Sequence, residues 1–135
     1  MVGAWTEVNE VNLSSYSVNK ESLSVSGFEG SDLTIASDGA ETLSFETSGP
    51  LVGTTKAGAK LAITIRGSAT FHIHADGRSY TETGSTTELP TTATLNGKAI
   101  PYHSSYAPGH GTYACDAHQL VTASAGGVQT DTWSR

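Results

Sequence analysis

Residues 60–83 read KLAITIRGSATFHIHADGRSYTET, and two patterns in this stretch decide the fold. Leu61, Ile63 and Ile65 alternate with small or polar residues, which is the period of two typical of a strand with one buried face. Asp76-Gly77 is a hairpin signal, because the central residues of a tight turn adopt positive φ. The stretch therefore predicts antiparallel strands joined by short turns.

The same period recurs along the chain. Leu23 and Val25 alternate with serines, and Leu33 and Ile35 alternate with small or polar residues. Further turn signals follow at regular intervals, at Asp38-Gly39, Gly49-Pro50, Asn96-Gly97 and Gly126-Gly127. Short strands at this spacing predict one all-β domain over residues 1–135, built as an antiparallel sandwich or barrel. The patterns predict no helix beyond a short one within residues 8–20 or near Phe28.

Turn length predicts which residues pair across each hairpin. Two-residue loops at Asp76-Gly77 and Asn96-Gly97 and a three-residue loop at Asp38-Gly39 keep the apolar residues on one face, whereas a slip by one residue would expose them all. The predicted pairs are Ile73 with Tyr80, Phe71 with Glu82, His74 with Ser79, His72 with Thr81, Ala93 with Ile100, Leu95 with Lys98, Ile35 with Leu43 and Leu33 with Phe45. Residues 83–92 and 104–111 are predicted as exposed loops.

His72 and His74 are candidate metal ligands, because two imidazoles on one strand face can reach the same zinc ion. The predicted register places both on the polar face of the hairpin. Nothing in the sequence brings a third ligand to them, although three further histidines are present, His103, His110 and His118. The register favours a solvent-facing pair, and we expect no metal and no cofactor.

The apolar face of the same hairpin supplies candidate ligand-binding residues. In a barrel this face lines the interior, and the residues expected there are Phe71, Ile73, Tyr80, Glu82, Tyr102 and Tyr113. Glu82 is either a desolvated carboxyl, able to anchor a ligand or act as acid or base, or a strand-end residue that reaches water. The tyrosines are also compatible with core residues whose hydroxyls are hydrogen-bonded. Cys115 is expected to be a small buried hydrophobe.

Composition argues against several functions. The net charge is -6, with 13 acidic residues against 7 Lys and Arg, whereas nucleic acids and anionic membrane surfaces attract basic patches. No apolar run approaches the roughly 20 residues of a spanning helix, so we expect no membrane insertion. The only cysteine is Cys115, which excludes a disulfide within the chain. The first five residues lack the basic start and apolar core of a signal peptide.

The two ends of the chain resemble the lipocalins and the wider calycin group. Gly3-Ala4-Trp5 is a Gly-x-Trp motif, and Arg135 follows the last predicted strand. In that group the motif's tryptophan closes one end of an up-and-down barrel and stacks on an arginine near the last strand. The resemblance implies that Trp5 covers one end and packs against Arg135, and that Gly3 lets the chain turn tightly into the first strand.

Residues 60–135 also resemble small exported actinobacterial proteins of lipocalin-like architecture. The likeness is carried by residues 69–78, 111–115 and 119–121, by the Gly-rich hairpin after them and by the final arginine. It implies an antiparallel up-and-down lipocalin-like β-barrel of about eight to ten strands, whose closure removes the sheet edges. It also implies a secreted or envelope-associated protein whose signal peptide has been removed, so that Met1 is not a native residue.

Three hypotheses of function follow. The first is a non-enzymatic exported module that binds a small apolar molecule or an envelope component in the barrel mouth. The second is a barrel enzyme, a cyclase or isomerase of natural-product biosynthesis, with Glu82 or a tyrosine as acid or base. The third is a self-assembling structural surface protein. A signal sequence in the precursor would separate the first from the second, and light scattering would test the third, since fold alone does not decide function.

Overall fold

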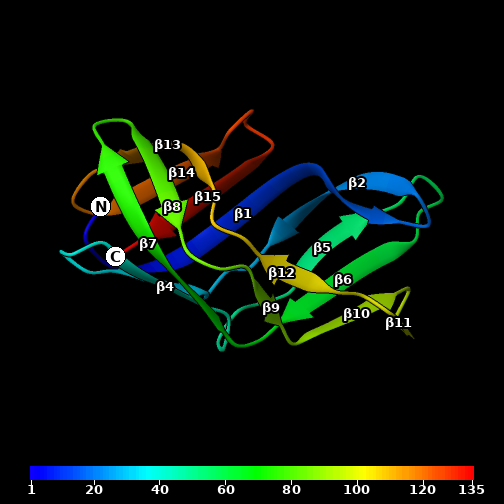
Figure 1. Ribbon diagram of the computed structural model, residues 1–135. Coiled ribbons are helices and arrows are strands. Elements are labelled where there is room, and N and C mark those ends of the chain that lie inside the picture. The colour runs from blue at the N-terminus through cyan, green and yellow to red at the C-terminus, as the bar shows by residue number, and fades with distance from the viewer.

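The computed structural model describes the backbone of residues 1–135 and the side chains of residues 1–13 and 16–135, and it is built from strands alone (Figure 1). The strands are β1 (Gly3–Val18), β2 (Glu21–Gly27), β3 (Asp32–Ile35), β4 (Ala40–Ser44), β5 (Leu51–Thr54), β6 (Lys60–Ile65), β7 (Ser68–Asp76), β8 (Ser79–Thr83), β9 (Thr87–Leu89), β10 (Thr91–Leu95), β11 (Lys98–Ile100), β12 (Ser104–Tyr106), β13 (His110–Cys115), β14 (Gln119–Ser124) and β15 (Gln129–Ser134). No helix that could cross a membrane occurs among the described residues.

Eight of the strands close into an antiparallel barrel. Their order is β1-β3-β4-β7-β8-β13-β14-β15, and β15 pairs again with β1. The order around the barrel follows the order along the chain, so the barrel is of the up-and-down type. This confirms the predicted fold class and leaves seven strands outside the barrel.

Those seven strands form a second lobe beside the barrel. They are inserted after β1, after β4 and after β8, so all three insertions leave the same end of the barrel. β2, β5, β6, β10 and β11 extend the sheet from the second half of β1, while β9 and β12 form a separate two-stranded ribbon. Figure 1 shows β1 running through both parts of the molecule.

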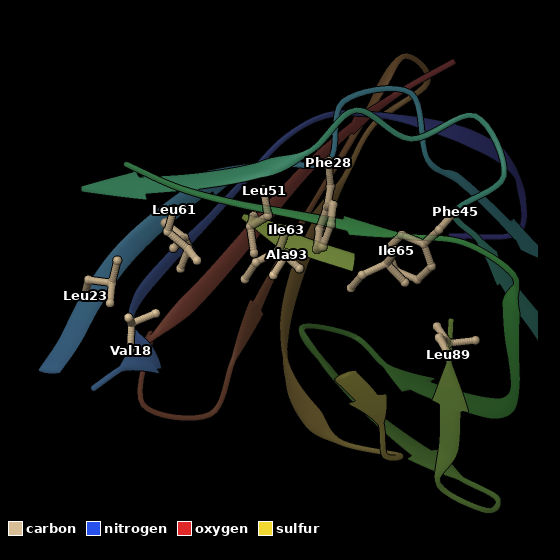
Figure 2. Packing of buried hydrophobic residues seen from close by; sticks show 11 residues of the cluster. Val18, Leu23, Phe28, Phe45, Leu51, Leu61, Ile63, Ile65, Leu89 and Ala93 are labelled. Atoms are coloured by element: carbon tan, nitrogen blue, oxygen red, sulfur yellow. The ribbon is translucent and has the colours of Figure 1, made fainter. Parts of the chain in front are cut away.

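The interior of the second lobe is apolar (Figure 2). Its buried side chains are Val18, Leu23, Val25, Phe28, Phe45, Leu51, Leu61, Ile63, Ile65, Leu89 and Ala93. The alternating residues of the opening stretch, Leu61, Ile63 and Ile65, are at most 1% exposed. Phe45 packs edge-on against Phe28, with ring centroids 5.1 Å apart, and lies 5.0 Å from the ring of Tyr106.

The ribbon corrects the prediction of two exposed loops. Residues 83–92 and 104–111 meet in space, where Leu89 pairs with Ser104 and Thr87 pairs with Tyr106. Leu89 is buried in the second-lobe core, so the ribbon covers apolar surface that the five-stranded sheet would otherwise expose. A search for alternating apolar residues does not detect short polar strands that pair with one another.

Hairpin registers agree with the sequence in one case and differ in two. Ala93 pairs with Ile100 and Leu95 with Lys98, as predicted for Asn96-Gly97. In the hairpin of β7 and β8 the loop is Gly77-Arg78 rather than Asp76-Gly77, so Ile73 pairs with Glu82 instead of Tyr80. The shift equals two residues, and a strand has a period of two, so every side chain keeps its predicted face.

The turn at Asp38-Gly39 has the predicted length of three residues but begins one residue earlier in the chain. Ile35 pairs with Glu41 and Leu33 with Leu43, instead of Leu43 and Phe45. The Ala36 N–H donates to the Ala40 carbonyl at 2.9 Å, which closes a three-residue loop over residues 37–39 instead of 38–40. The register shift is two residues, so Glu41 lies on the same inner face as Leu43 in the predicted register and in the observed one.

Trp5 and Arg135 close the end of the barrel opposite the second lobe. Trp5 is 1% exposed, and the Arg135 guanidinium lies 4.1 Å from the centre of its ring. Arg135 also donates to the Val2 carbonyl at 2.6 Å. A Cβ at Gly3, which has φ +142°, would collide with the Arg135 side chain. The predicted contact is therefore confirmed, and Gly3 is required by close approach as well as by its backbone conformation.

Candidate binding site in the barrel

The barrel encloses a cavity of about 180 Å³. Seven of the eight barrel strands contribute inward-facing side chains to its wall, and β13 contributes only the exposed His110 at its start. The lining residues are Met1, Glu7, Glu10, Phe28, Leu33, Ile35, Glu41, Leu43, Phe45, Phe71, Ile73, Tyr80, Glu82, Tyr106, Ala107, Gly109, His110, Leu120, Thr122, Ser124, Gln129, Asp131 and Trp133. Exposed Ala107 and His110 lie on the side of the second lobe, so the cavity approaches solvent there.

One part of the wall is apolar. Leu33, Ile35, Ile73, Leu120 and Trp133 are buried together and pack with Trp5 at the closed end. Strand pairing aligns them, since Leu120 lies opposite Trp133 and Leu33 lies opposite Trp5. This part of the wall can cover an apolar body.

The rest of the wall is acidic. Its five carboxyl side chains come from four strands: Glu7, Glu10, Glu41, Glu82 and Asp131. No Lys or Arg side chain is among the lining residues that the structure describes. The cavity therefore combines an apolar wall with a concentration of negative charge.

A β-bulge explains why β1 places two glutamates inside. Glu7 lies opposite Trp133 and Glu10 lies opposite Asp131, but the register shifts between Glu7 and Asn9. Strict alternation from Trp5 would turn Asn9 inward and Glu10 outward. The bulge adds one residue on this strand and so reverses the faces beyond it.

Glu7 lies among other acidic groups. The Ser31 hydroxyl lies 2.7 Å from Glu7 Oε2 and 2.6 Å from the Phe28 carbonyl oxygen, and when its proton is donated to the carbonyl, its oxygen can accept a hydrogen bond from protonated Glu7. Burial first, and then the negative charge of Asp131, raises the pKa of Glu7 to about 10. Burial also raises the pKa of Asp131, to which Gln129 Nε2 donates at 3.0 Å. Glu7 is therefore a neutral carboxylic acid at pH 7 when no cation is near.

Glu10 extends this acidic group toward the tyrosines of the second-lobe side. Burial and then the charge of Asp131 raise the pKa of Glu10 to about 8. Burial also raises the pKa of Tyr106, which stays a neutral phenol and closes the cavity wall on this side.

Glu41 and Glu82 form a second acidic group. Glu41 is 6% exposed, and burial followed by the charge of Glu82 raises its pKa to about 8. Glu82 Oε2 accepts a hydrogen bond of 2.8 Å from the Gly109 N–H, and the Glu82 N–H donates to the Gly109 carbonyl at 2.8 Å. Glu82 thus holds the segment that leads from β12 to β13 against β8.

The structure brings four of the six predicted ligand residues together. Phe71, Ile73, Tyr80 and Glu82 all line the cavity. Tyr113 faces inward opposite Thr122, but it packs on the apolar cluster and does not line the cavity.

Tyr102 and Cys115 lie elsewhere than predicted. Tyr102 belongs to the second lobe, where it stacks on Tyr16 with ring centroids 6.4 Å apart, because the chain between β8 and β13 leaves the barrel and returns only near Tyr106. Cys115 is exposed, not buried, because it ends β13 at the rim of the barrel.

The paired histidines lie on the outer face of β7. His72 and His74 are exposed, and His72 Nε2 lies 2.7 Å from the Asp38 carbonyl oxygen. Among the residues with described side chains, no group of three His, Cys, Asp or Glu has the arrangement of a metal site.

Sequence reasoning missed four carboxyl groups of the cavity: Glu7, Glu10, Glu41 and Asp131. A signal existed for three of them: Glu7 and Asp131 each lie two residues from a tryptophan, and Glu41 lies two residues from Leu43, which the predicted register places on the apolar face. Glu10 depends on the bulge, which has no local sequence signal here.

Comparison of the chain with protein-family models, with curated proteins and with solved structures finds no match. The function is therefore argued from the cavity itself.

Proposed function

We propose that the protein is a non-enzymatic binding module of lipocalin-like type that holds a small molecule in its barrel. The enclosed cavity, with an apolar wall at one end and polar groups at the other, is the observation that carries this proposal. Its volume of about 180 Å³ is close to the roughly 150 Å³ of a cavity known to accept benzene. A ligand built on a single ring fits this space.

Export is part of the same proposal, as is attachment to the cell envelope. The Trp5–Arg135 contact and the up-and-down barrel support a relation to exported lipocalin-like proteins. Fractionation of cells that express the complete gene, followed by immunodetection, tests this part. Recovery from the cytoplasmic fraction alone would contradict it.

A screen of single-ring compounds by ligand-observed NMR tests binding in the cavity. We expect hits that bind once per chain and that lose at least about tenfold in affinity in Thr122→Phe, whose added ring occupies the cavity. The matched control is Val121→Phe, on the opposite face of the same strand. Absence of hits, or hits that bind Thr122→Phe as well as the original protein, would refute the proposal.

An acid–base enzyme is the second candidate, favoured by one observation. Glu41, with a pKa raised to about 8, lies beside the charge of Glu82 on the cavity wall and can hold a transferable proton. A cyclase or isomerase would use such a pair. Mass spectrometry and NMR of a bound molecule after incubation separate the candidates: unchanged ligand supports the module, whereas conversion that disappears in Glu41→Gln supports the enzyme.

A further inference from the structure

We infer that the ligand of the barrel is a small organic amine that binds as its ammonium ion, with its apolar body against the apolar wall. This inference rests on the proposed function, and it names the chemical class of the ligand. It stands on the geometry of the acidic wall and on two carboxyl oxygens within it.

Those two oxygens are the groups whose hydrogen bonding is incomplete. Glu7 and Glu41 are 4% and 6% exposed, and both line the cavity. Among the described side chains, no N–H or O–H group donates to Glu7 Oε1 or to Glu41 Oε2. Their charged neighbours are Asp131 and Glu82, and two carboxyl groups can hydrogen-bond to each other only if one holds a proton. A proton or a bound donor must therefore satisfy each oxygen.

No Lys or Arg side chain is among the described residues that line this wall. The titratable residues of the cavity lining are Met1, through its α-amino group, Glu7 and Glu10 from β1, Glu41 from β4, Tyr80 and Glu82 from β8, Tyr106 from β12, His110 from β13 and Asp131 from β15. A buried carboxylate without a partner is costly, and an ammonium ion offers both the charge and the N–H donors that the wall lacks.

The remainder of the wall favours an organic cation over a metal ion. The described side chains include no group of three or more ligands arranged for a metal. The buried surface of Leu33, Ile73 and Trp133 gains nothing from a bare ion, but it can cover a ring. The aromatic face of a tryptophan also attracts ammonium groups. The volume allows about one ring with a short amine arm.

Proton release is a signature of this mode of binding. The raised pKa values of Glu7, near 10, and of Glu10 and Glu41, near 8, mean that these groups hold protons at neutral pH. An ammonium ion stabilises the carboxylate form, so its binding expels protons. Affinity for an amine should therefore rise with pH between about 6 and 8, below the pKa of the amine itself.

The experiment compares three probes of similar shape and different charge: benzylamine, benzyl alcohol and benzoate. Calorimetry near pH 8 should show benzylamine binding at least about tenfold more tightly than benzyl alcohol, with benzoate weakest. Titrations in buffers of different ionisation enthalpy should show proton release for benzylamine alone. Glu7→Gln and Glu41→Gln should each weaken benzylamine by about fivefold or more and leave benzyl alcohol unchanged, while the exposed control Glu88→Gln should change neither.

Outcomes for the two proposals are distinguishable. Equal affinity for benzylamine and benzyl alcohol, or tighter binding of benzoate, would overturn the amine inference and leave the binding module standing. Failure of benzylamine to bind at millimolar concentration would also overturn it, whatever the screen of other single-ring compounds finds. The comparison of probes uses the unaltered protein, so it does not depend on how the variants fold.

Discussion

The second lobe and the barrel both bury side chains on their inner faces, but those side chains differ in chemistry. In the lobe, Leu61 and Ile63 are at most 1% exposed and pack against other hydrocarbon groups. In the barrel, Glu7 and Glu10 are at most 4% exposed and face other carboxyl groups. Burial of an alkyl side chain is favourable by about 1.5–3 kcal/mol, whereas burial of an ionised carboxylate is strongly unfavourable. Apolar burial in the lobe thus stabilises the fold, whereas burial of the acidic wall lowers the stability of the fold.

Trp5→Ala should have the largest effect, because apolar packing in the barrel is concentrated at the closed end. Loss of a buried indole costs about 3–5 kcal/mol of unfolding free energy, and loss of the cation contact adds to this. Urea unfolding measures the change. Arg135→Ala, which removes only the cation, should cost about 1 kcal/mol, since a terminal residue frays. If the urea midpoint of Trp5→Ala stayed within the range of surface substitutions, packing at the closed end would not be what stabilises the barrel.

Ile63→Ala should cost about 3 kcal/mol, because Ile63 is fully buried in the second-lobe core and leaves a cavity. Val52→Ala is the matched control on β5, which pairs with the strand of Ile63; its side chain is 45% exposed and its loss should cost less than about 0.5 kcal/mol. Chemical denaturation of both variants makes the comparison. Similar costs would mean that the lobe core is loosely packed.

Stability should fall as pH rises from about 5 to 8, opposite to the behaviour of a protein held by salt bridges. The folded-state pKa values of Glu10 and Glu41 are raised from 4.5 to about 8, and that of Glu7 to about 10. Their stabilising contribution is complete below about pH 4.5 and is lost as pH rises through the folded-state values. Each group that keeps its proton in the fold lowers the free energy of unfolding by up to about 1.4 kcal/mol per pH unit over this interval, and urea unfolding at stepped pH measures the fall. A rise over this interval would show that these groups are ionised in the fold.

Glu41→Gln should have the smallest effect and the opposite sign. At pH 8 the variant removes an acid that must hold a proton in the fold, so the free energy of unfolding should increase by about 1 kcal/mol. At pH 4.5 the increase should nearly vanish, since Glu41 is then protonated in the folded state and about half protonated in the unfolded chain. Thermal unfolding at the two pH values tests this, and a destabilised variant at pH 8 would show that Glu41 has a structural role.

The alternation of apolar and polar residues predicted the fold because a register error of two residues leaves every side chain on its predicted face. Both misjudged hairpins slipped by two residues, so Phe71, Ile73, Tyr80 and Glu82 kept the predicted face. The acidic wall could not be predicted in the same way. Glu10 faces inward through a bulge, and Tyr102 lies outside the barrel because an insertion carries it to a partner far along the chain, Tyr16. Such features depend on tertiary packing, which overrides a local pattern.

β1 belongs to both parts of the molecule, and this affects how the protein unfolds. Its 16 residues pair with β15 and β3 in the barrel and with β2 in the second lobe, so neither part keeps its hydrogen bonds when β1 detaches. Opening of the site and opening of the apolar core are then the same cooperative event. A ligand held in the barrel should therefore slow amide hydrogen exchange in β2, β5 and β6, strands that it does not touch.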